Sequence, residues 1–335
     1  MRAVSFLMVG LAAGALACGN GDDASSPVAI AMEAGADGSK GPDASAGPDA
    51  ADADAAIAPE AGEASPPLPP TQALLRMANW SADSPAVDFC LSPHGTGNFR
   101  GPILAAAAAT MGEGGVVGAL PFPQASSYQL LEPGSYDARL VAAGSVDCAT
   151  AIVADDTTLP VLGSGGLATI ALVGAAHPQQ GEPGLELVGF TDELKNSLPD
   201  ALLIRVINAE VDLPQAEVGT LNTYFTPFLD PVDFGKSSAG DQMADPNGYI
   251  VELAIVNQTL AARATVPSLL GAPAHTIVAQ APTINLPTGN TVTFVVVGSG
   301  GQLGADGGPE LSRILECVDN AGTAGLVGAC KVISQ

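Results

Sequence analysis

The residue types that most often carry catalysis are sparse in this chain. It contains three histidines, and each stands beside Gly, Pro or Ala in a segment that we expect to be a loop: His94, His177 and His275. A Ser-His-Asp triad needs one of them near an activated serine, and the sequence has no Gly-x-Ser-x-Gly elbow. We therefore interpret the histidines as solvated loop residues and predict that the chain is not an enzyme.

Carboxylates and glycine-rich segments give no specific site either. The pairs Asp155–Asp156 and Glu182–Glu186 would act together only if folding happened to join them. The run Asp241-x-x-x-Asp245-x-Asn247-Gly248 has calcium-binding residue types without the spacing of a known calcium loop, so we predict a turn. The glycine-rich segments 163–166 and 298–304 precede no expected helix that would hold a phosphate, so we expect hairpin loops. No metal and no cofactor is predicted.

The five cysteines are the most informative reactive residues. Cys18 stands apart near the N-terminus, and the other four lie far along the chain: Cys90, Cys148, Cys317 and Cys330. Four cysteines permit three pairings, and an even number in an oxidising compartment indicates disulfides. We favour Cys90–Cys148 with Cys317–Cys330, because this pairing crosses no expected domain boundary. A zinc site is the competing interpretation, but neither pair has short ligand spacing or a neighbouring histidine.

The N-terminus is typical of an export signal followed by an anchor. Residues 1–17 form a short signal peptide, with one arginine ahead of an apolar, small-residue run. Ala15-Leu16-Ala17-Cys18 resembles a bacterial lipobox, in which the Cys is acylated after cleavage, although Ala15 replaces the usual larger residue. Several acyl chains on Cys18 would anchor the protein stably to a membrane. Gly19 in place of an inner-membrane retention Asp favours an outer-membrane lipoprotein, and ordinary cleavage with secretion is the alternative.

Residues 18–70 are predicted to be a disordered tether behind the lipidated Cys. From residue 19 they hold ten carboxylates, a single lysine (Lys40) and no aromatic residue. Too few large apolar side chains are present to offset the entropy of folding, and the repelling carboxylates keep such a segment extended. We interpret it as a spacer between the membrane and the folded part.

Short apolar runs separated by Gly and Pro begin at residue 71, and they predict strands. Leu75, Met77 and Asn79 alternate with other residues, while 167–173 and 291–297 are predominantly apolar and look like central strands with both faces largely covered. The segment 309–318 is also read as strand. The predicted fold class is therefore all-β: two tandem antiparallel β-sandwich modules of immunoglobulin-like type after the disordered tether.

An internal repeat supports this division. Arg76, Asn79, Asp83 and Pro85 recur at a single constant offset as Arg205, Asn208, Asp212 and Pro214. A second set, which includes Thr169 and Thr293, recurs in the same order further on, and a looser echo pairs Asp192 with Asp319. A tandem duplication is the simplest account, with module 1 at 71–197 and module 2 at 198–335. Because Arg76 and Arg205 lie inside apolar strands, we expect each to pair with a carboxylate of its own module, Asp88 and Glu217 respectively.

The first repeat resembles a known family. Residues 75–88, Leu-Arg-Met-Ala-Asn-Trp-Ser-Ala-Asp-Ser-Pro-Ala-Val-Asp, are similar to the opening strand and turn of the domain-of-unknown-function 4397 family. Leu131-x-Pro133-Gly134-x-Tyr136-x-x-Arg139 resembles its middle segment. Asn79 replaces the family's usual His, and the second copy keeps fewer positions. The resemblance implies secreted or envelope-anchored β modules, often in tandem, and brings no established activity, ligand or catalytic residue.

Charge and composition narrow the remaining functions. The formal net charge of −24 argues against a nucleic-acid partner, which would need a basic surface. We therefore expect a lipid-anchored cell-envelope protein that binds or scaffolds a protein or glycan ligand through the loops of its sandwiches. The main alternative is an envelope enzyme, such as a glycan hydrolase with a carboxylate site, and a passive spacer is the third interpretation.

Overall fold

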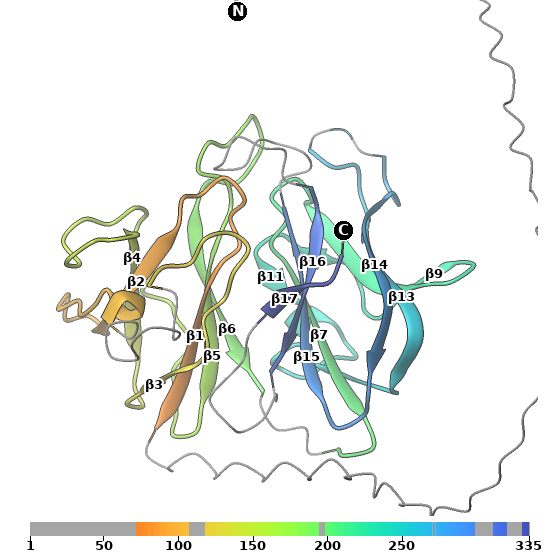
Figure 1. The fold of residues 1–335 in the computed structure, drawn as a ribbon, viewed down its shortest axis with the longest axis horizontal. Helices are drawn as coiled ribbons and strands as arrows, with labels where there is room; N and C mark the ends of the chain where they lie inside the picture. Colours follow the sequence, from red (N-terminus) through yellow and green to blue (C-terminus); the bar gives the residue numbers. More distant parts are fainter. Residues whose placement is uncertain are drawn as a thin grey trace, which may run out of the picture. The chain divides into compact units, whose positions relative to one another are not determined.

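The computed structural model describes residues 72–106, 118–193, 198–269, 271, 273–298, 311–319 and 330–334 (Figure 1). The predicted signal peptide, Cys18 and the predicted tether lie outside these ranges. The regular secondary structure of the described residues is β-strand, apart from a helical turn at 103–106 and the short helix η1 (Ser238–Gly240), and turns and irregular segments connect the strands. The prediction of an all-β fold is therefore confirmed. No helix in these ranges is long and apolar enough to span a membrane.

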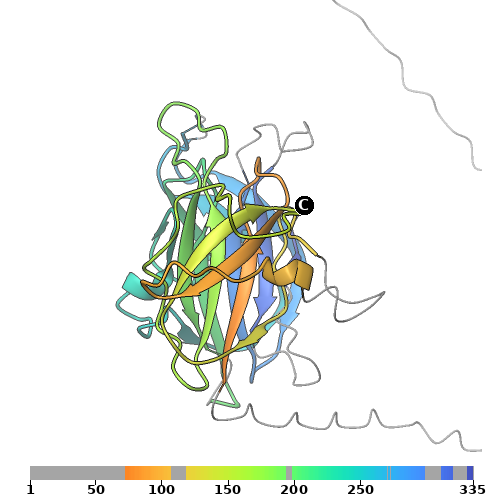
Figure 2. The same ribbon diagram turned by 90° about the vertical axis from the view of Figure 1, so that its left-hand side faces the viewer.

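A first sandwich is built by the first six strands. One sheet has the order β3-β1-β5-β6, and β2 with β4 forms the second sheet, which Figure 2 views from its outer side. Leu75, Met77, Phe89, Leu140 and Ile170 meet between the sheets as its core. The strands are β1 (Ala73–Asn79), β2 (Val87–Pro93), β3 (Gln129–Leu131), β4 (Tyr136–Ala142), β5 (Leu167–Val173) and β6 (Glu186–Asp192).

A second sandwich repeats this plan with additional strands. Its larger sheet has the order β11-β7-β15-β16-β17 with β12 also on β7, and it faces a sheet β10-β8-β13-β14 with β9 on β8. Ile204, Val206, Leu260 and Phe294 lie in its core. The strands are β7 (Leu202–Asn208), β8 (Gln215–Leu221), β9 (Phe225–Pro227), β10 (Val232–Asp233), β11 (Lys236–Ser237), β12 (Ile250–Glu252), β13 (Ile255–Ala264), β14 (Ile277–Leu286), β15 (Thr291–Val297), β16 (Arg313–Val318) and β17 (Cys330–Val332).

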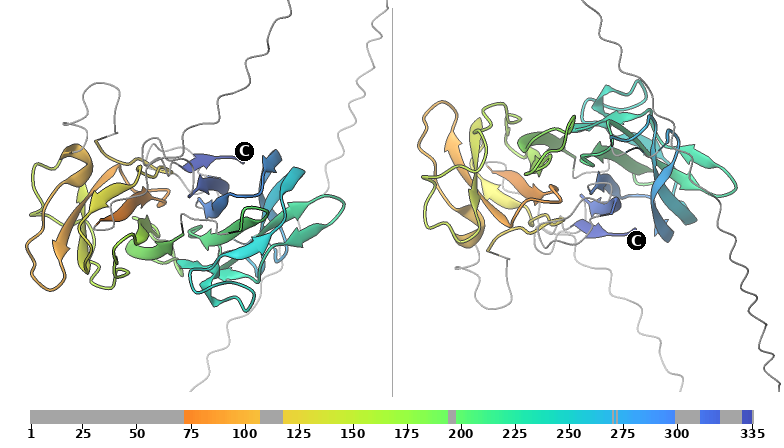
Figure 3. Two further views of the ribbon diagram at one scale, coloured as in Figure 1. Left: turned by 90° about the horizontal axis from the view of Figure 1, so that it is seen from below. Right: turned by 90° about the horizontal axis from the view of Figure 1, so that it is seen from above.

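The larger sheets of the two sandwiches pack against each other, as Figure 3 shows end-on. A third apolar cluster joins Trp80 and Phe190 of the first sandwich to Ile207, Val295 and Leu315 of the second. Strands β1, β5, β7 and β15 are consequently buried on both faces. This explains why 167–173 and 291–297 are predominantly apolar, and it confirms the prediction that they are central strands.

Two central strand pairs run parallel, which the prediction of antiparallel sheets does not include. β1 pairs with β5, and β7 pairs with β15, each in parallel register. The chain leaves β1 for the opposite sheet, forms β2 and β4 there, and returns beside β1 in the same direction. A crossover of this kind produces a parallel pair although consecutive strands remain antiparallel. The strand predicted for 309–318 is confirmed over Arg313–Val318, which form β16, whereas residues 311 and 312 are irregular.

Candidate functional site

A cluster of ionisable side chains lies between the two larger sheets, and we call it the buried charge cluster. All of its members are almost completely shielded from solvent. It consists of Arg76, Tyr128, Thr169 and Asp192 from the first sandwich and Arg205, Tyr249, Thr293 and Asp319 from the second. Charges in such a place are costly unless each one is paired and hydrogen-bonded.

Strand alternation explains why two arginines point into this space. Leu75 and Met77 face the core of the first sandwich, so Arg76 between them must face the opposite way, toward the second sandwich. Arg205 lies between the core residues Ile204 and Val206 of β7 and is turned outward in the same manner.

Within the first sandwich, Arg76 is held by a hydroxyl and an aromatic ring. Its Nε donates to Thr169 Oγ1 at 2.9 Å, and its guanidinium lies 4.9 Å from the centre of the Tyr128 ring. Asp192 Oδ2 accepts hydrogen bonds from both hydroxyls, at 2.5 Å from Thr169 and 2.9 Å from Tyr128. The hydroxyls thereby satisfy acceptor positions that the arginines leave open.

The second sandwich contains the same arrangement at corresponding residues. Arg205 Nε donates to Thr293 Oγ1 at 3.1 Å, and its guanidinium lies 4.6 Å from the centre of the Tyr249 ring. Asp319 Oδ2 accepts from Thr293 at 2.6 Å and from Tyr249 at 2.9 Å.

The ion pairs of the cluster connect the sandwiches reciprocally. Arg76 Nη1 lies 2.9 Å from Asp319 Oδ1, and Arg205 Nη2 lies 2.5 Å from Asp192 Oδ1. Arg205 Nη1 also donates to the carbonyl of Thr191 at 2.6 Å. Asp192 has Arg76 as a second, more distant cation at 3.8 Å. Each sandwich therefore neutralises an arginine of the other.

The expected partners of the two arginines were wrong. Asp88 accepts backbone N–H groups of Phe89, Leu104 and Ala105 instead of pairing with Arg76. Glu217 pairs with Arg263 at 2.5 Å instead of with Arg205. The expectation assumed that a module satisfies its own charges, whereas the alternation along β1 and β7 directs both arginines across the interface.

Burial and charge shift the pKa values of the cluster in opposing ways. Burial raises the pKa of Asp192, but Arg205 and Arg76 outweigh it and hold that pKa below its usual range. Burial also raises the pKa of Asp319. Arg76 lowers that pKa, but by less than burial raises it, so it stays above the usual range. Burial raises the pKa values of Tyr128 and Tyr249 well above that of a free phenol. Both tyrosines are therefore hydrogen-bond donors at neutral pH.

The sequence pattern contained a partial signal for this cluster. Thr169 with Thr293, and Asp192 with Asp319, are among the recurring residues, but recurrence alone did not give them a role. Polar residues inside otherwise apolar, doubly buried strands were the usable sign. Tyr128 and Tyr249, which directly precede the short strands β3 and β12, are not among the recurring residues, so recurrence gives no sign of their role.

The recurring asparagines cap the turn after the first strand of each sandwich. Asn79 Nδ2 donates to the carbonyls of Pro85 and Leu120 at 3.2 and 3.0 Å. Asn208 Nδ2 donates to the carbonyls of Leu213 and Val232 at 2.9 and 3.1 Å. Asp83 accepts from the backbone N–H groups of residues 176 and 177 at 2.7 and 2.8 Å. Pro85 and Pro214 adjoin the same turns, and Asp212 at the second turn is buried.

Both favoured disulfides are present. Cys90 joins Cys148 within the first sandwich, and Cys317 joins Cys330 within the second. Cys317 and Cys330 are direct neighbours on β16 and β17, so this disulfide fastens the last strand to the sheet. In the ranges that the structure covers, no three His, Cys, Asp or Glu side chains gather as metal ligands would.

The residues considered for chemistry are spread over several loops. Asp241 and Asp245 accept backbone N–H groups of Met243 and Asn247, which confirms the predicted turn. His94 Nδ1 lies 2.6 Å from Asp137 Oδ1, and its side chain is half-exposed. The nearby hydroxyl of Ser92 instead hydrogen-bonds Thr96 at 2.9 Å, so these residues do not form a triad.

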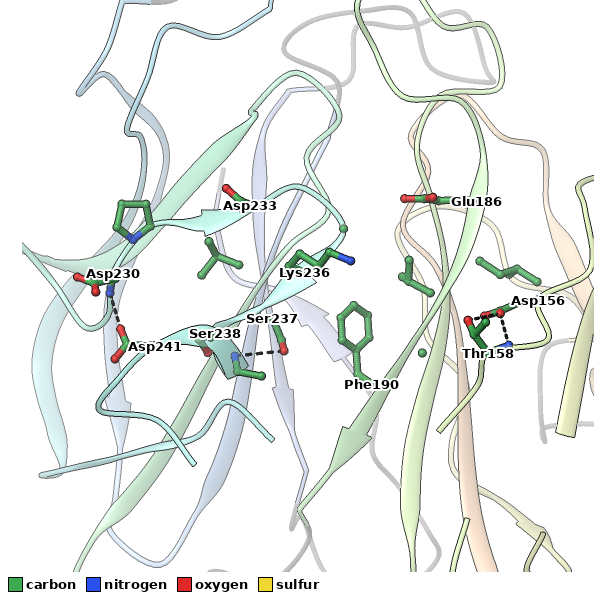
Figure 4. Close-up of a pocket in the computed structure, with 18 residues that line it drawn as sticks. Asp156, Thr158, Glu186, Phe190, Asp230, Asp233, Lys236, Ser237, Ser238 and Asp241 are labelled. Atoms are coloured by element: carbon green, nitrogen blue, oxygen red, sulfur yellow. Dashed lines mark hydrogen bonds between the residues drawn. The ribbon is translucent and has the colours of Figure 1, made fainter. Parts of the chain in front are cut away.

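An open groove of about 780 Å³ lies between β6 and the segment 230–241 of the second sandwich, and we call it the inter-sandwich groove (Figure 4). β6 forms one wall, and the segment 230–241 with β10, β11 and η1 forms the other. Its lining includes a single lysine, Lys236, and five carboxylates, those of Asp156, Glu186, Asp230, Asp233 and Asp241. The groove brings Asp156 and Glu186 to one site but includes neither Asp155 nor Glu182.

Comparison with known proteins adds no assignment: the chain matches no known family model, and no curated protein is significantly similar to it.

Proposed function

We propose that this chain is a lipid-anchored protein of the cell envelope, held in the outer membrane by Cys18, whose two sandwiches bind a partner without catalysing a reaction. The burial of the charge cluster carries the non-catalytic part of the proposal. Arg76, Asp192, Arg205 and Asp319 have fully buried side chains, and none of them lines the inter-sandwich groove. Groups with shifted pKa values often mark active sites, but these four are used to join two sheets.

The chain's division into modules 71–197 and 198–335 is part of the same proposal, as is membership of the domain-of-unknown-function 4397 family. Support for a tandem duplication comes from matched contacts. The backbone N–H groups of Met77 and Val206 each donate to a serine hydroxyl, Ser126 and Ser238, at 3.0 Å. The Arg-Thr hydrogen bonds and the asparagine caps recur in the same way. Two unrelated modules would have no reason to repeat so many polar contacts.

The anchor is tested by mass spectrometry of the mature N-terminus. We expect cleavage before Cys18 and a mass that includes acyl chains on that residue. Cys18→Ala should leave the protein outside the membrane fraction, while Cys90→Ala is the matched control that removes a cysteine without removing the anchor. An unmodified Cys18 at the N-terminus of the mature protein would refute anchoring and favour secretion. The two disulfides fit a compartment outside the cytoplasm.

The binding role is tested with the full chain on arrays of envelope proteins and glycans. We expect a saturable ligand and no turnover of it. The second candidate, an envelope glycan hydrolase, is favoured by one observation, the carboxylates on both walls of the groove, of which Figure 4 labels Glu186 and Asp233. Products from a digest of envelope polymers that disappear in Glu186→Gln or Asp233→Asn would establish the enzyme instead. If the arrays yield no ligand and the digest yields no product, the passive-spacer interpretation remains.

A further inference from the structure

β6 is an edge strand whose outer side opens into the inter-sandwich groove. It pairs with β5, and the strands of the described chain provide no neighbour on its other side. Leu187, Val188 and Gly189 line the groove together with Glu186 and Phe190. An uncovered edge presents backbone donors and acceptors that can pair with another extended chain.

The hydrogen-bond pattern identifies the backbone groups on this edge. The Leu172 carbonyl accepts from Trp80 on the β1 side, so its neighbour Ala171 is turned toward β6. Ala171 is in register with Val188, which therefore uses its backbone groups on β5. Alternation then directs the backbone groups of Leu187 and Gly189 outward, into the groove. The Thr191 carbonyl, on the same side, accepts from Arg205.

The second sandwich shows how such an edge is covered. β16 is the counterpart of β6, since Asp319 follows it as Asp192 ends β6, and β17 lies along its outer side. Ile314 donates its N–H to Ser334 Oγ at 2.6 Å and accepts from the Ile333 N–H at 2.9 Å. Glu316 is in register with Lys331, whose Nζ lies 3.0 Å from Glu316 Oε1. Counting back from the two aspartates, Ile314 corresponds to Leu187 and Glu316 to Gly189.

The charge of the groove indicates which kind of extended segment could pair with the outer edge of β6. The groove has five carboxylates against one lysine, and Glu186, Asp233 and Lys236 are exposed. A basic extended segment is therefore favoured, as Lys331 is on β17. The chain's own predicted tether is a poor occupant, because residues 19–70 contain ten carboxylates and only Lys40.

We propose that the outer edge of β6 binds an extended basic peptide segment of a partner protein as an additional antiparallel strand. The segment occupies on β6 the place that β17 occupies on β16. Residues opposite Leu187 and Gly189 pair with their backbone groups, and alternate residues pack on Val188 and Phe190. This inference rests on the proposed binding function and names its site and partner class.

The test uses the full chain and a fluorescent peptide, Val-Lys-Val-Lys-Val-Lys, followed by fluorescence anisotropy. If the peptide pairs with β6 as β17 pairs with β16, the backbone N–H groups of its lysines face β6, as the backbone of Lys331 faces β16. We expect saturable binding that is lost when the backbone nitrogens of the lysines are methylated. Binding should be retained when the backbone nitrogens of the valines are methylated instead. Both methylated peptides keep the same charge and side chains. Equal binding of all three peptides would show that the positive charge of the peptide alone accounts for its binding, and it would overturn the proposal.

Charge variants locate the peptide. Glu186→Gln with Asp233→Asn should weaken binding about fivefold, because two exposed charges of the groove are removed. The matched control, Asp147→Asn with Asp200→Asn, removes two exposed carboxylates outside the groove and should leave the affinity unchanged. Equal weakening by both pairs, or no binding at all, contradicts the strand proposal. An array ligand unaffected by the groove variants would preserve the proposed function while refuting this site.

Discussion

Arg76 of the first sandwich lies 2.9 Å from Asp319 of the second, measured from Nη1 to Oδ1, and both side chains are completely buried. The reverse pair, Arg205 with Asp192, completes a reciprocal exchange of charge between the two sheets. In each sandwich the carboxylate nearest to the arginine belongs to the other sandwich. The exchange therefore makes the interface between the sandwiches part of each sandwich's own stability.

Removal of one partner should be costly because the other charge stays buried. Arg76→Met and Asp319→Asn are each expected to lower the free energy of unfolding by about 3–5 kcal/mol, and the double variant by less than their sum. Urea unfolding followed by tryptophan fluorescence measures the cycle, since the single tryptophan, Trp80, lies buried at the interface.

Arg139 and Asp155 provide the matched control for that cycle. Their side chains are 24% and 28% exposed, and the ion pair measures 2.7 Å. Their coupling energy should be smaller, about 1 kcal/mol, because solvent still screens this bidentate pair in part. A coupling between Arg76 and Asp319 that is no larger than this control would contradict the structural role given to the buried charge cluster.

The two sandwiches should unfold together. Calorimetry of the wild-type chain is expected to show one transition, since the shared apolar cluster and both ion pairs are lost at once. Combining Arg76→Met with Arg205→Met should separate it into two transitions, because the paired aspartates then oppose the packing. Two transitions in the wild-type chain would show that the interface does not couple the sandwiches.

The two buried aspartates should give opposite pH dependence. The folded pKa of Asp192 lies below its ordinary value, so its stabilisation is present above the unfolded pKa and is lost as the pH falls through the folded pKa. The folded pKa of Asp319 lies above its ordinary value, so its contribution is greatest below the unfolded pKa and declines as the pH rises through the folded pKa.

Stability measured from pH 2 to pH 7 for the wild type, Asp192→Asn and Asp319→Asn separates these contributions. The cost of Asp192→Asn should grow as the pH rises, and the cost of Asp319→Asn should shrink. Equal slopes for both variants would show that the shared arginines do not distinguish the two carboxylates.

The disulfides should differ in their contribution to stability. Cys90–Cys148 closes a loop with a sequence separation of 58, and Cys317–Cys330 one of 13. Chain entropy gives about 4 kcal/mol for the first and about 3 kcal/mol for the second. Replacing each pair with alanines and measuring urea unfolding tests the order. Loss of Cys317–Cys330 should also speed hydrogen exchange in β17, which pairs with the sheet only through β16. Unchanged exchange there would show that the strand holds its place without the disulfide.

The amino-acid sequence by itself determined the local features of this protein. Alternating and predominantly apolar runs predicted the strands, since burial of one or both faces leaves its period in the residues. Cysteine number and position predicted both disulfides, and the recurring Arg-x-x-Asn pattern predicted that the two arginine positions are alike. The signal peptide, the acylation of Cys18 and the tether stay predictions.

Only the tertiary structure decided which groups meet. Arg76 could be placed on a strand from its neighbours, but its partner, Asp319, lies in another sandwich and is distant in the sequence. Parallel pairing of β1 with β5 likewise depends on a crossover that no local pattern records. The outer edge of β16 is covered by β17, whereas the described residues place no strand on the outer edge of β6. Periodicity reports the burial of a residue, whereas pairing depends on how separately formed sheets pack.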